Sequence, residues 1–452
     1  MPDTIAAIAT GAQVSAIGIL RLSGPEAISL ADQLFHPISG RPLREAEDRR
    51  LLYGRLCTRQ GELLDLCLCT VSRAPNSYTG EDTAELQCHG SPVVLRAALD
   101  ELFALGARQA GPGEFTRRAF LNGRLDLSAA EAVIDLIDAE SAEAAKNAAG
   151  QLAGAIRVKT ERLYDALADI SAHYHAVLDY PDEDIEDFQL SAYRERIEET
   201  ETELRRLLDG FARGKHLTSG IPAVLLGRPN AGKSSLLNAL LGYDRAIVTE
   251  VPGTTRDTIE EKLRLGPLLL RLTDTAGLHD ADDRVERLGV SRAREAAARS
   301  DLVLAVIDGS VPLTAEDREV LALAAQAPKA VLVFSKADLP RVAERPDSPL
   351  PAVSLSALTG AGLDELKQAV EALYPLPAVP AGEILTNARQ ADAVGRALDA
   401  LRAADDALQA GSTPDIVLTE TESAMSALGE LTGRTVREDV TNRIFQRFCV
   451  GK

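Results

Sequence analysis

Short apolar runs separated by turn residues make up the first part of the chain. Three runs have the length of strands and are bounded by glycine, proline or asparagine: Ile17 to Leu22, Leu63 to Val71 and Ala84 to Cys88. One stretch, Pro92 to Leu105, has the apolar spacing of a helix instead. The pattern therefore predicts a small α/β domain over residues 1–118.

The pattern becomes helical after Gly113. No proline occurs from there to Tyr180, and Ala, Leu and Glu dominate. Apolar residues recur three, four or seven positions apart, which indicates long packed helices. They include Val133, Ile137, Leu152, Ile156, Leu163, Leu167 and Ile170. An acidic segment, Asp179 to Asp187, is interpreted as a solvated loop rather than a metal site, and a further helix is predicted from Ala192 to Gly214.

A second pattern of strands and helices runs from Ile221 to about Tyr374. Apolar runs rich in β-formers alternate there with helical stretches, which is typical of a doubly wound, mostly parallel sheet. The runs are Ala223 to Leu226, Leu268 to Leu272, Leu302 to Ile307 and Ala330 to Phe334. A proline-rich joint, Pro375 to Pro380, closes this region, and helix-like sequence resumes from Thr386 with a break at Gly411 to Pro414.

The simplest account of this order is that the second α/β domain is inserted into a helical domain. The predicted fold is thus multidomain α/β, with an N-terminal domain over 1–118, the helical domain over 119–216 and 377–452, and the inserted domain over 217–376. Two separate helical domains would give the same pattern.

Composition and charge restrict the possible classes of protein. The chain has 452 residues, of which 45% are hydrophobic, and this excludes a disordered chain. The formal net charge of −19 argues against electrostatic coating of RNA or of an anionic membrane. Any contact with nucleic acid is expected to be a local patch or to come from a partner.

The N-terminus and the cysteines point to a cytoplasmic protein. Met1 to Leu20 is apolar but lacks the positive start of a signal peptide, and short strands around a turn fit it better. The five cysteines are few and odd in number, so a disulfide framework is not expected. Cys67 and Cys69 flank Leu68 and are interpreted as buried packing residues on one face of a strand.

The clearest chemical motif is a phosphate-binding loop. Gly227-Arg-Pro-Asn-Ala-Gly-Lys-Ser234 follows an apolar strand and opens a helix, Ser235 to Leu241. Backbone N–H groups at a helix N-terminus bind phosphate, a lysine such as Lys233 reaches the β- and γ-phosphates, and the Ser234 hydroxyl ligates Mg²⁺.

Further short motifs follow in the order expected of a GTPase. Asp274-Thr-Ala-Gly277 comes after a strand, and its carboxylate can hold Mg²⁺ through water. Gly253-Thr-Thr-Arg-Asp257 offers a hydroxyl to complete the Mg²⁺ shell. Ser335-Lys-Ala-Asp338 places a carboxylate where it can accept hydrogen bonds from the N1 and N2 edge of guanine, and Ser356-Ala-Leu358 would contact the base. Together, each at a strand end, these motifs indicate a GTPase.

Two positions depart from the usual GTPase pattern. The base-recognition motif normally begins with asparagine, and Ser335 is expected to brace the neighbouring loops less well, with guanine preference left to Asp338. Leu278 stands where many GTPases have a water-orienting glutamine, so the catalytic group is expected to come from elsewhere. Asn230 either ligates a monovalent cation beside the phosphates or braces the loop.

Longer motifs narrow the match to one family. The chain resembles the Era-like branch of GTPases and, within it, the MnmE (TrmE) family of tRNA modification GTPases. The resemblance rests on these segments: Gly18 to Gly24, Asn76 to Asp82, Pro112 to Asn122, Gly227 to Asn238, Ile247 to Asp257 and Phe448 to Lys452.

The resemblance implies a GTPase that acts in tRNA modification. The N-terminal domain would bind a tetrahydrofolate derivative (5-formyl- or methylene-tetrahydrofolate) and form a homodimer, and the GTPase domains would meet across K⁺. With the flavoprotein MnmG, the family adds an aminomethyl or carboxymethylaminomethyl group to C5 of the wobble uridine. Contact with tRNA would be made through the complex.

The resemblance also implies roles for individual residues. K⁺ would be held by Asn230, Thr249, the carbonyl of Val251 and Thr254, and Mg²⁺ by Ser234 and Thr255. Glu286 would orient the attacking water. GTP would contact Asn230, Ala231, Gly232, Lys233, Ser234, Ser235, Thr249, Glu250, Val251, Pro252, Gly253, Thr254, Thr255, Asp274, Thr275, Ala276, Gly277, Ser335, Lys336, Ala337, Asp338, Ser356, Ala357 and Leu358.

For the folate, the resemblance implies contacts with Arg21, Glu85, Arg124 and Lys452. A carboxylate such as Glu85 can accept the amino edge of a pterin, and cations suit the glutamate tail. Without the resemblance, Arg21 and Glu85 would be interpreted as a surface pair of little energetic value. The family commonly has lysine where this chain has Arg124. Contact with Lys452 requires the end of the chain to fold back onto the N-terminal domain, and Cys449 there is either a catalytic or redox thiol or a packed residue.

An assembly GTPase that binds RNA and does no one-carbon chemistry is the alternative function. It would be expected to carry a basic RNA-binding extension, which the net charge of −19 does not support.

Overall fold

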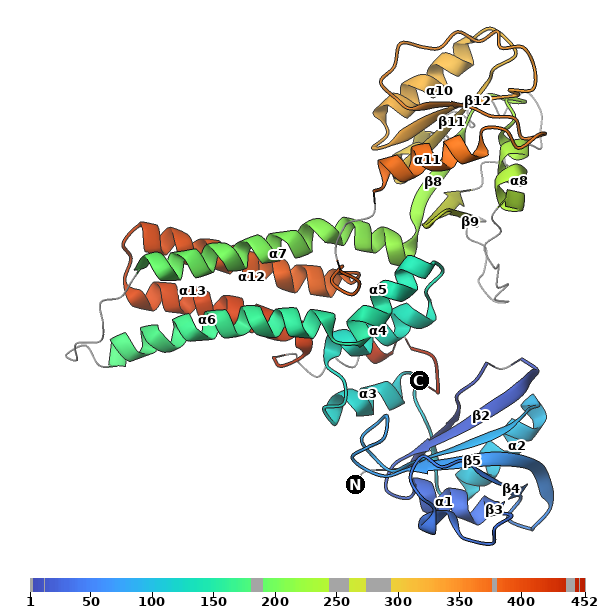
Figure 1. Cartoon of the computed structure of the whole chain (residues 1–452), viewed down its shortest axis with the longest axis vertical. Helices are drawn as coiled ribbons and strands as arrows, with labels where there is room; N and C mark the ends of the chain where they lie inside the picture. The colour runs from blue at the N-terminus through green and yellow to red at the C-terminus, as the bar shows by residue number, and fades with distance from the viewer. Residues whose placement is uncertain are drawn as a thin grey trace. The chain divides into compact units, whose positions relative to one another are not determined.

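The computed structural model describes residues 3–11, 13–179, 190–243, 260–273, 294–375, 380–435, 444–446 and 448–451 (Figure 1). The chain divides into two compact units. The first comprises Met1–Ile134, Gln151–Arg196 and Asp399–Lys452, and the second comprises Asp135–Gly150 and Ile197–Leu398. None of the helices in the described ranges has the length and apolar character needed to cross a membrane.

The first unit begins with an α/β domain built on one sheet. Its described strands, in spatial order, are β3 (Phe35–Pro37), β4 (Leu52–Cys57), β5 (Leu63–Ser72), β6 (Thr83–Gly90), β2 (Ser15–Ser23), β1 (Ile5–Ile8) and β7 (Arg108–Gln109). All neighbours are antiparallel except β1 and β7. The predicted strands and the predicted helix, α2 (Pro92–Ala104), are all present.

One face of this sheet is covered by helices, and the opposite, open face is exposed along β5 but buried at β1, where Ile5 and Ala7 pack against Phe115. Along β5, Cys67, Cys69 and Val71 are buried while Leu66 and Leu68 are exposed, because successive side chains of a strand point to opposite faces. The buried face packs against α1 (Ala27–Leu34), a short turn at Leu43–Glu45 and α2. Four of the five cysteines are buried, which confirms that Cys67 and Cys69 are packing residues. The open face of the sheet carries Arg21 and Glu85, two of the predicted folate contacts.

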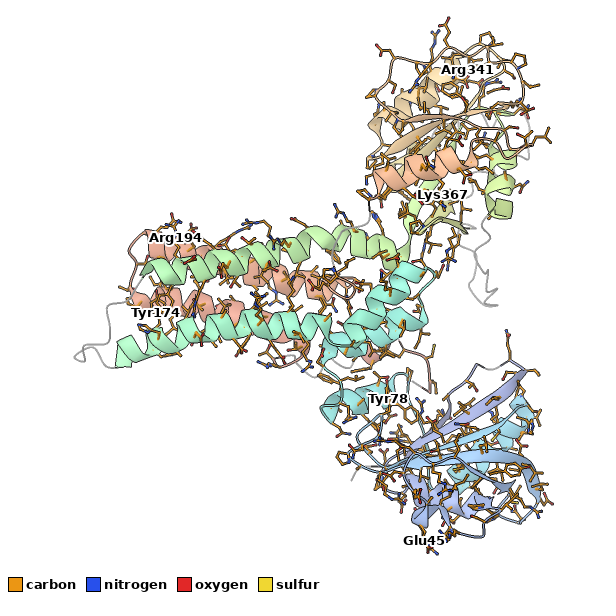
Figure 2. The ribbon with its side chains drawn as sticks, viewed as in Figure 1. Glu45, Tyr78, Tyr174, Arg194, Arg341 and Lys367 are labelled. Carbon is orange, nitrogen blue, oxygen red and sulfur yellow. The ribbon has the colours of Figure 1, made fainter. Side chains whose placement is uncertain are left out.

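The helical region begins with α3 (Glu114–Leu121), α4 (Leu127–Ile137), α5 (Ala142–Leu152) and α6 (Ala155–Asp179). It continues with α7 (Leu190–Ser219), and after the second sheet with α12 (Ala388–Gln409) and α13 (Pro414–Thr432). Within the first unit, α6 contacts α13, where His175 Nε2 lies 2.9 Å from Glu422 Oε1. Arg194 of α7, labelled in Figure 2, forms an ion pair of 3.2 Å with Asp405 of α12. Helices from both sides of the second sheet in sequence are therefore in contact, and the exact domain boundaries stay a prediction.

Helix α7 extends further than the sequence predicts. Its expected end at Gly214 is wrong, because the helix continues to Ser219. A Cβ at Gly214 would lie 1.9 Å from the carbonyl oxygen of Leu385, so this glycine allows a close backbone approach inside the helix. The glycine therefore serves packing, not helix termination.

The second sheet is doubly wound, as predicted. Its described strands are ordered β13 (Ala352–Ser354), β12 (Ala330–Ser335), β11 (Leu302–Asp308), β8 (Ile221–Leu226), β10 (Leu268–Thr273) and β9 (Glu260–Leu265). All neighbours are parallel except β9, which is antiparallel to β10. The helices α8 (Lys233–Tyr243) and α11 (Leu363–Leu373) cover one face, and α10 (Ala315–Gln326) covers the other. The strands β11 and β12 are buried along their whole length, as expected of central parallel strands.

Candidate functional site

The phosphate-binding loop lies between β8 and α8, at the carboxyl edge of the parallel strands. Asn230 and Gly232 have φ values of 62° and 97°, in the left-handed region. A Cβ at Gly227 would lie 2.5 Å from the carbonyl oxygen of Val306, so only glycine allows the loop to approach β11 this closely. The loop leads directly into the N-terminus of α8 at Lys233, which is the geometry that binds phosphate. Ser234 and Ser235, the predicted Mg²⁺ and phosphate contacts, follow as exposed residues.

The Lys233 ammonium group lies folded back over this loop. Its Nζ donates hydrogen bonds to the carbonyl oxygens of Gly227 and Arg228, at 2.7 and 2.9 Å. Burial lowers the pKa of Lys233, since the charge is partly removed from water. A phosphate would provide this cation with the anionic partner that the two neutral carbonyls do not supply.

Ser335 connects the base-recognition strand to the phosphate-binding loop. Its hydroxyl lies 2.5 Å from the carbonyl oxygen of Ala231 and 3.1 Å from that of Ile307, and the residue is 5% exposed. The single proton of a hydroxyl can serve only one of these acceptors at a time, whereas an asparagine amide carries two. Serine therefore makes the bracing contact, with one donor fewer than asparagine.

Asp338 is held by the loop that follows β13. The hydroxyl of Ser356, which is fully buried, donates to Asp338 Oδ1 at 2.6 Å. This hydrogen bond lowers the pKa of Asp338, so the exposed carboxylate stays ionised and can accept from guanine. The N–H of Ala337 donates to the carbonyl of Leu355 at 3.1 Å and joins the two loops. The side chain of Leu358, in the same loop as Ser356, is 85% exposed, and its contact with the base stays a prediction.

An ionic network not anticipated from the sequence supports both loops. Lys336 Nζ lies 2.6 Å from Asp308 Oδ2, at the end of β11. Arg228 of the phosphate-binding loop is 3.6 Å from the same carboxylate and 3.4 Å from Asp317 of α10. Burial opposes ionisation of Asp308, but its hydrogen bonds with Lys336 and Ser310 outweigh burial and lower its pKa. The only sign of this network in the sequence was Asp308, an acidic residue at the carboxyl end of the apolar strand β11.

The remaining predicted nucleotide and metal ligands lie outside the described residues. They are Thr249, Glu250, Val251, Pro252, Gly253, Thr254, Thr255, Asp274, Thr275, Ala276, Gly277 and Glu286, together with the neighbouring Leu278. Most of the acidic segment from Asp179 to Asp187 is also outside the described ranges. Across the described part of the chain, no group of three or more His, Cys, Asp or Glu side chains is arranged to hold a metal ion.

The first two predicted folate contacts form a pair on the open face of the N-terminal sheet. Arg21 and Glu85 are opposite each other on β2 and β6, and Arg21 Nε donates to Glu85 Oε1 at 2.8 Å. Their side chains are only 22% and 28% exposed. The guanidinium of Arg21 lies 5.7 Å from the ring centroids of both Tyr78 and Phe115. Arg21 therefore lies beside two aromatic rings, and the half-buried pair is not a freely solvated surface contact.

Arg124 lies beside the loop from Asn76 to Asp82 of the N-terminal domain. A Cβ at Gly80 would lie 3.3 Å from Cγ of Arg124, so this exposed arginine borders the loop that carries Tyr78. Tyr78, labelled in Figure 2, reaches α3, where its hydroxyl lies 3.0 Å from Thr116 Oγ1. Arg21 and Arg124 therefore each lie beside the loop from Asn76 to Asp82, and Glu85 is hydrogen-bonded to Arg21.

The C-terminal tail folds back onto the N-terminal domain, as contact with the folate would require. The N–H of Gly113 donates to the carbonyl of Cys449 at 3.3 Å, and Val450 pairs with Pro112. Cys449 is exposed, so its interpretation as a packed residue is wrong. Lys452 lies outside the described residues.

Comparison with known proteins gives matches along the whole chain. The family model for the N-terminus of GTP-binding protein TrmE matches residues 4–124, and that for the MnmE helical domain matches residues 127–449. Proteins named tRNA modification GTPase MnmE are 45% identical in Symbiobacterium thermophilum and 43% identical in Roseiflexus sp. and in Chloroflexus aurantiacus. Each alignment covers 100% of this chain and at least 99% of the relative.

Among solved structures, the cytosolic domain of the T. maritima FeoB iron transporter in a GDP form aligns with 48% of the chain. The alignment covers 97% of the FeoB domain, with 19% identity and a TM-score of 0.25. This TM-score is too low to support a conclusion about the fold. The two family models and the full-length relatives establish the family instead. The chain belongs to the MnmE family of tRNA modification GTPases.

Proposed function

We propose that this chain is the GTP-hydrolysing subunit of a complex that adds an aminomethyl or carboxymethylaminomethyl group to C5 of the wobble uridine in tRNA, using a one-carbon unit from tetrahydrofolate. The observation that carries the proposal is the full-length match to proteins named tRNA modification GTPases. The braced carboxylate of Asp338 supports guanine as the base, because adenine offers no matching pair of donors.

For hydrolysis, we propose that K⁺ supplies the positive charge that an arginine finger supplies in other GTPases. It would be held by Asn230 together with Thr249, the Val251 carbonyl and Thr254. Asn230 lies in the phosphate-binding loop with a left-handed backbone, three residues before Lys233, and this placement fits an oxygen ligand beside the phosphates. Mg²⁺ would be held by Ser234 and Thr255, and Glu286 would orient the attacking water.

For the folate, we propose a site around Arg21 and Glu85. Within the described part of the chain, Glu85 Oε2 accepts no hydrogen bond, and it can therefore receive the amino edge of a pterin. The rings of Tyr78 and Phe115 offer apolar surface beside it. Arg124 and Lys452 would pair with the carboxylates of the glutamate tail. The bound folate would supply the one-carbon unit, and Cys449, exposed on the same domain, is the candidate thiol.

For assembly, we propose a homodimer formed by the N-terminal domain and a further complex with the flavoprotein MnmG. The open face of the sheet supports dimerisation, because Tyr53, Leu66 and Leu68 expose 51%, 42% and 36% of their surface on adjacent strands. The strongly acidic chain is expected to contact tRNA through the complex rather than by a broad basic surface.

The proposal is tested by mass spectrometry of tRNA nucleosides from cells that lack this protein. The modified wobble uridines should be absent, and they should return with the wild-type chain. A Lys233→Ala variant should not restore them, because it lacks the phosphate-binding ammonium. Lys215→Ala, which removes an exposed lysine of α7, is the matched control and should restore them. Unchanged wobble uridines in the deleted cells would overturn the proposed function.

A further inference from the structure

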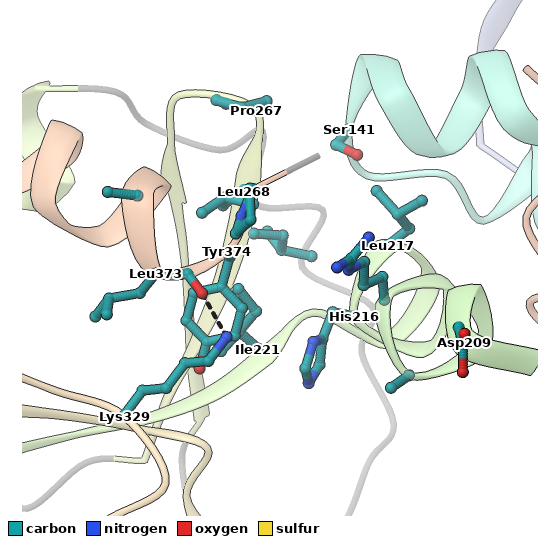
Figure 3. A pocket seen from close by; sticks show the side chains of 15 residues that line it. Ser141, Asp209, His216, Leu217, Ile221, Pro267, Leu268, Lys329, Leu373 and Tyr374 are labelled. Atoms are coloured by element: carbon teal, nitrogen blue, oxygen red, sulfur yellow. Dashed lines mark hydrogen bonds between the residues drawn. The ribbon is translucent and has the colours of Figure 1, made fainter. Parts of the chain in front are cut away.

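A pocket of about 530 Å³ lies at the C-terminal end of α7, within the second unit. It shares no residue with the phosphate-binding loop or the base-recognition loops. Its walls come from α7, from the start of β10, from the residue before β12 and from the end of α11 (Figure 3). Its volume is in the range of small-molecule sites, which are commonly about 300–1,000 Å³.

Two cations stand in this pocket. Lys329 Nζ lies 3.6 Å from the ring centroid of Tyr374 and donates to the carbonyl oxygen of Leu373, as Figure 3 shows. Arg213 of α7 is exposed and makes no ion pair or hydrogen bond with the described residues. Burial lowers the pKa of Lys329, and the like charge of Arg213 lowers it further. The two cations therefore repel each other, and an anion between them would relieve that repulsion.

Acidic groups near these two cations compensate their positive charge only in part. The charge of Asp301 raises the pKa of Lys329, but by less than burial and Arg213 lower it, and the same carboxylate lies 3.1 Å from His216 Nε2 through its Oδ2. Asp209 stands one turn before Arg213 on α7 and is exposed to solvent, and within the described ranges it forms no ion pair with that arginine. Because water screens an exposed carboxylate, Asp209 neutralises little of the positive charge of Arg213.

The rest of the lining is apolar. Leu217 on α7, Ile221, Leu268 and Leu269 contribute aliphatic surface, and Tyr374 contributes its ring (Figure 3). This ring is fixed, because its hydroxyl donates to the carbonyl of Asp301 at 2.9 Å and the His216 ring meets it edge-on at 5.5 Å. The pocket therefore combines two cations with apolar lining and a fixed aromatic ring, which suits a ligand that has both an anionic group and an apolar part.

We propose that this pocket binds a small organic anion, with a carboxylate or phosphate group between Arg213 and Lys329 and an apolar ring or chain against Leu268 and Leu269. The anion would thus connect Arg213 on α7 with Lys329, the residue that precedes β12. The pocket lies where the chain passes from α7 into β8 and where it leaves α11. The pocket has no lining residue in common with the predicted GTP contacts or with the folate candidates.

The test uses the full chain with Mg²⁺ and saturating GDP, so that the phosphate-binding loop is occupied. Binding of 1-naphthyl phosphate, 1-naphthoate and the neutral 1-naphthol is followed by ligand-detected NMR titration. The two anions distinguish a phosphate from a carboxylate ligand, and the neutral compound measures the apolar contribution alone. The variants are Arg213→Gln, Arg213→Lys and the control Lys215→Gln, which removes a cation of the same helix outside the pocket.

We expect at least one anion to bind at least about tenfold more tightly than 1-naphthol, since charge-assisted hydrogen bonds are the stronger ones. Arg213→Gln should weaken that binding about tenfold, Arg213→Lys should largely preserve it, and Lys215→Gln should leave it unchanged. The inference is overturned if neither anion binds, if 1-naphthol binds equally well, or if Arg213→Gln has no more effect than Lys215→Gln. Because Arg213 is exposed, loss of folding is not expected, and circular dichroism checks it.

Discussion

Replacing Ser335 by alanine tests whether the base-recognition strand braces the phosphate-binding loop. The buried hydroxyl lies 2.5 Å from the carbonyl of Ala231, and alanine removes this donor while changing the volume little. A neutral hydrogen bond of this kind contributes about 0.5–1.5 kcal/mol net. If the bond orders the loop before nucleotide binds, its loss lowers GDP affinity by at most that amount, or roughly two- to thirteenfold. The free energy of unfolding should fall by a similar amount.

The assay for Ser335→Ala is fluorescence titration with a labelled GDP, combined with urea unfolding. Ser354→Ala is the matched control, since Ser354 is exposed at the end of β13, and it should change neither quantity. Ser335→Asn tests the same reasoning in the other direction, because its second donor can serve the carbonyl of Ile307, so GDP affinity should rise. A folded Ser335→Ala variant that binds GDP as tightly as wild type would refute the bracing role.

Three further predictions concern hydrolysis, the folate and pH. GTP turnover should depend on K⁺ and fail in Na⁺, given Asn230 in the loop and Leu278 in place of glutamine, and equal rates in KCl and NaCl would exclude this mechanism. Glu85→Ala should weaken binding of 5-formyl-tetrahydrofolate in calorimetric titration by about 1–3 kcal/mol, one to two decades, with GTP turnover unchanged; a folded variant that binds normally would place the ligand elsewhere. Ser356→Ala removes the hydrogen bond that lowers the pKa of Asp338. The ionised form is then favoured less, so GDP affinity should be lost at a higher pH than in wild type as the solution is acidified, and coincident pH profiles would contradict this.

Local motifs were predictable because neighbouring residues carry them. The phosphate-binding loop needs one strand, one turn and one helix start, and all three are contiguous from Ile221 to Tyr243. The longer strands of both sheets were predicted in the same way, since alternation or unbroken apolar runs indicate how many faces are buried. The strands β1, β3, β4, β7, β9 and β13 were not predicted individually. The end of α7 was misjudged, because the sequence does not reveal that Leu385 passes close to Gly214.

Contacts between distant segments were decided only by the tertiary structure. Arg21 meets Glu85 across 64 positions because β2 and β6 are neighbours, and Ser335 at the end of β12 meets Ala231 of the phosphate-binding loop across 104 positions. The same holds for the pocket between Arg213 and Lys329, whose cations stand on separate elements with no pattern that links them. By itself, the sequence determined the fold class, the nucleotide motif and the family, since each depends on local geometry or on matching residues. Which charges pair and which cations remain unpaired depends on long-range packing, and only the folded chain decides it.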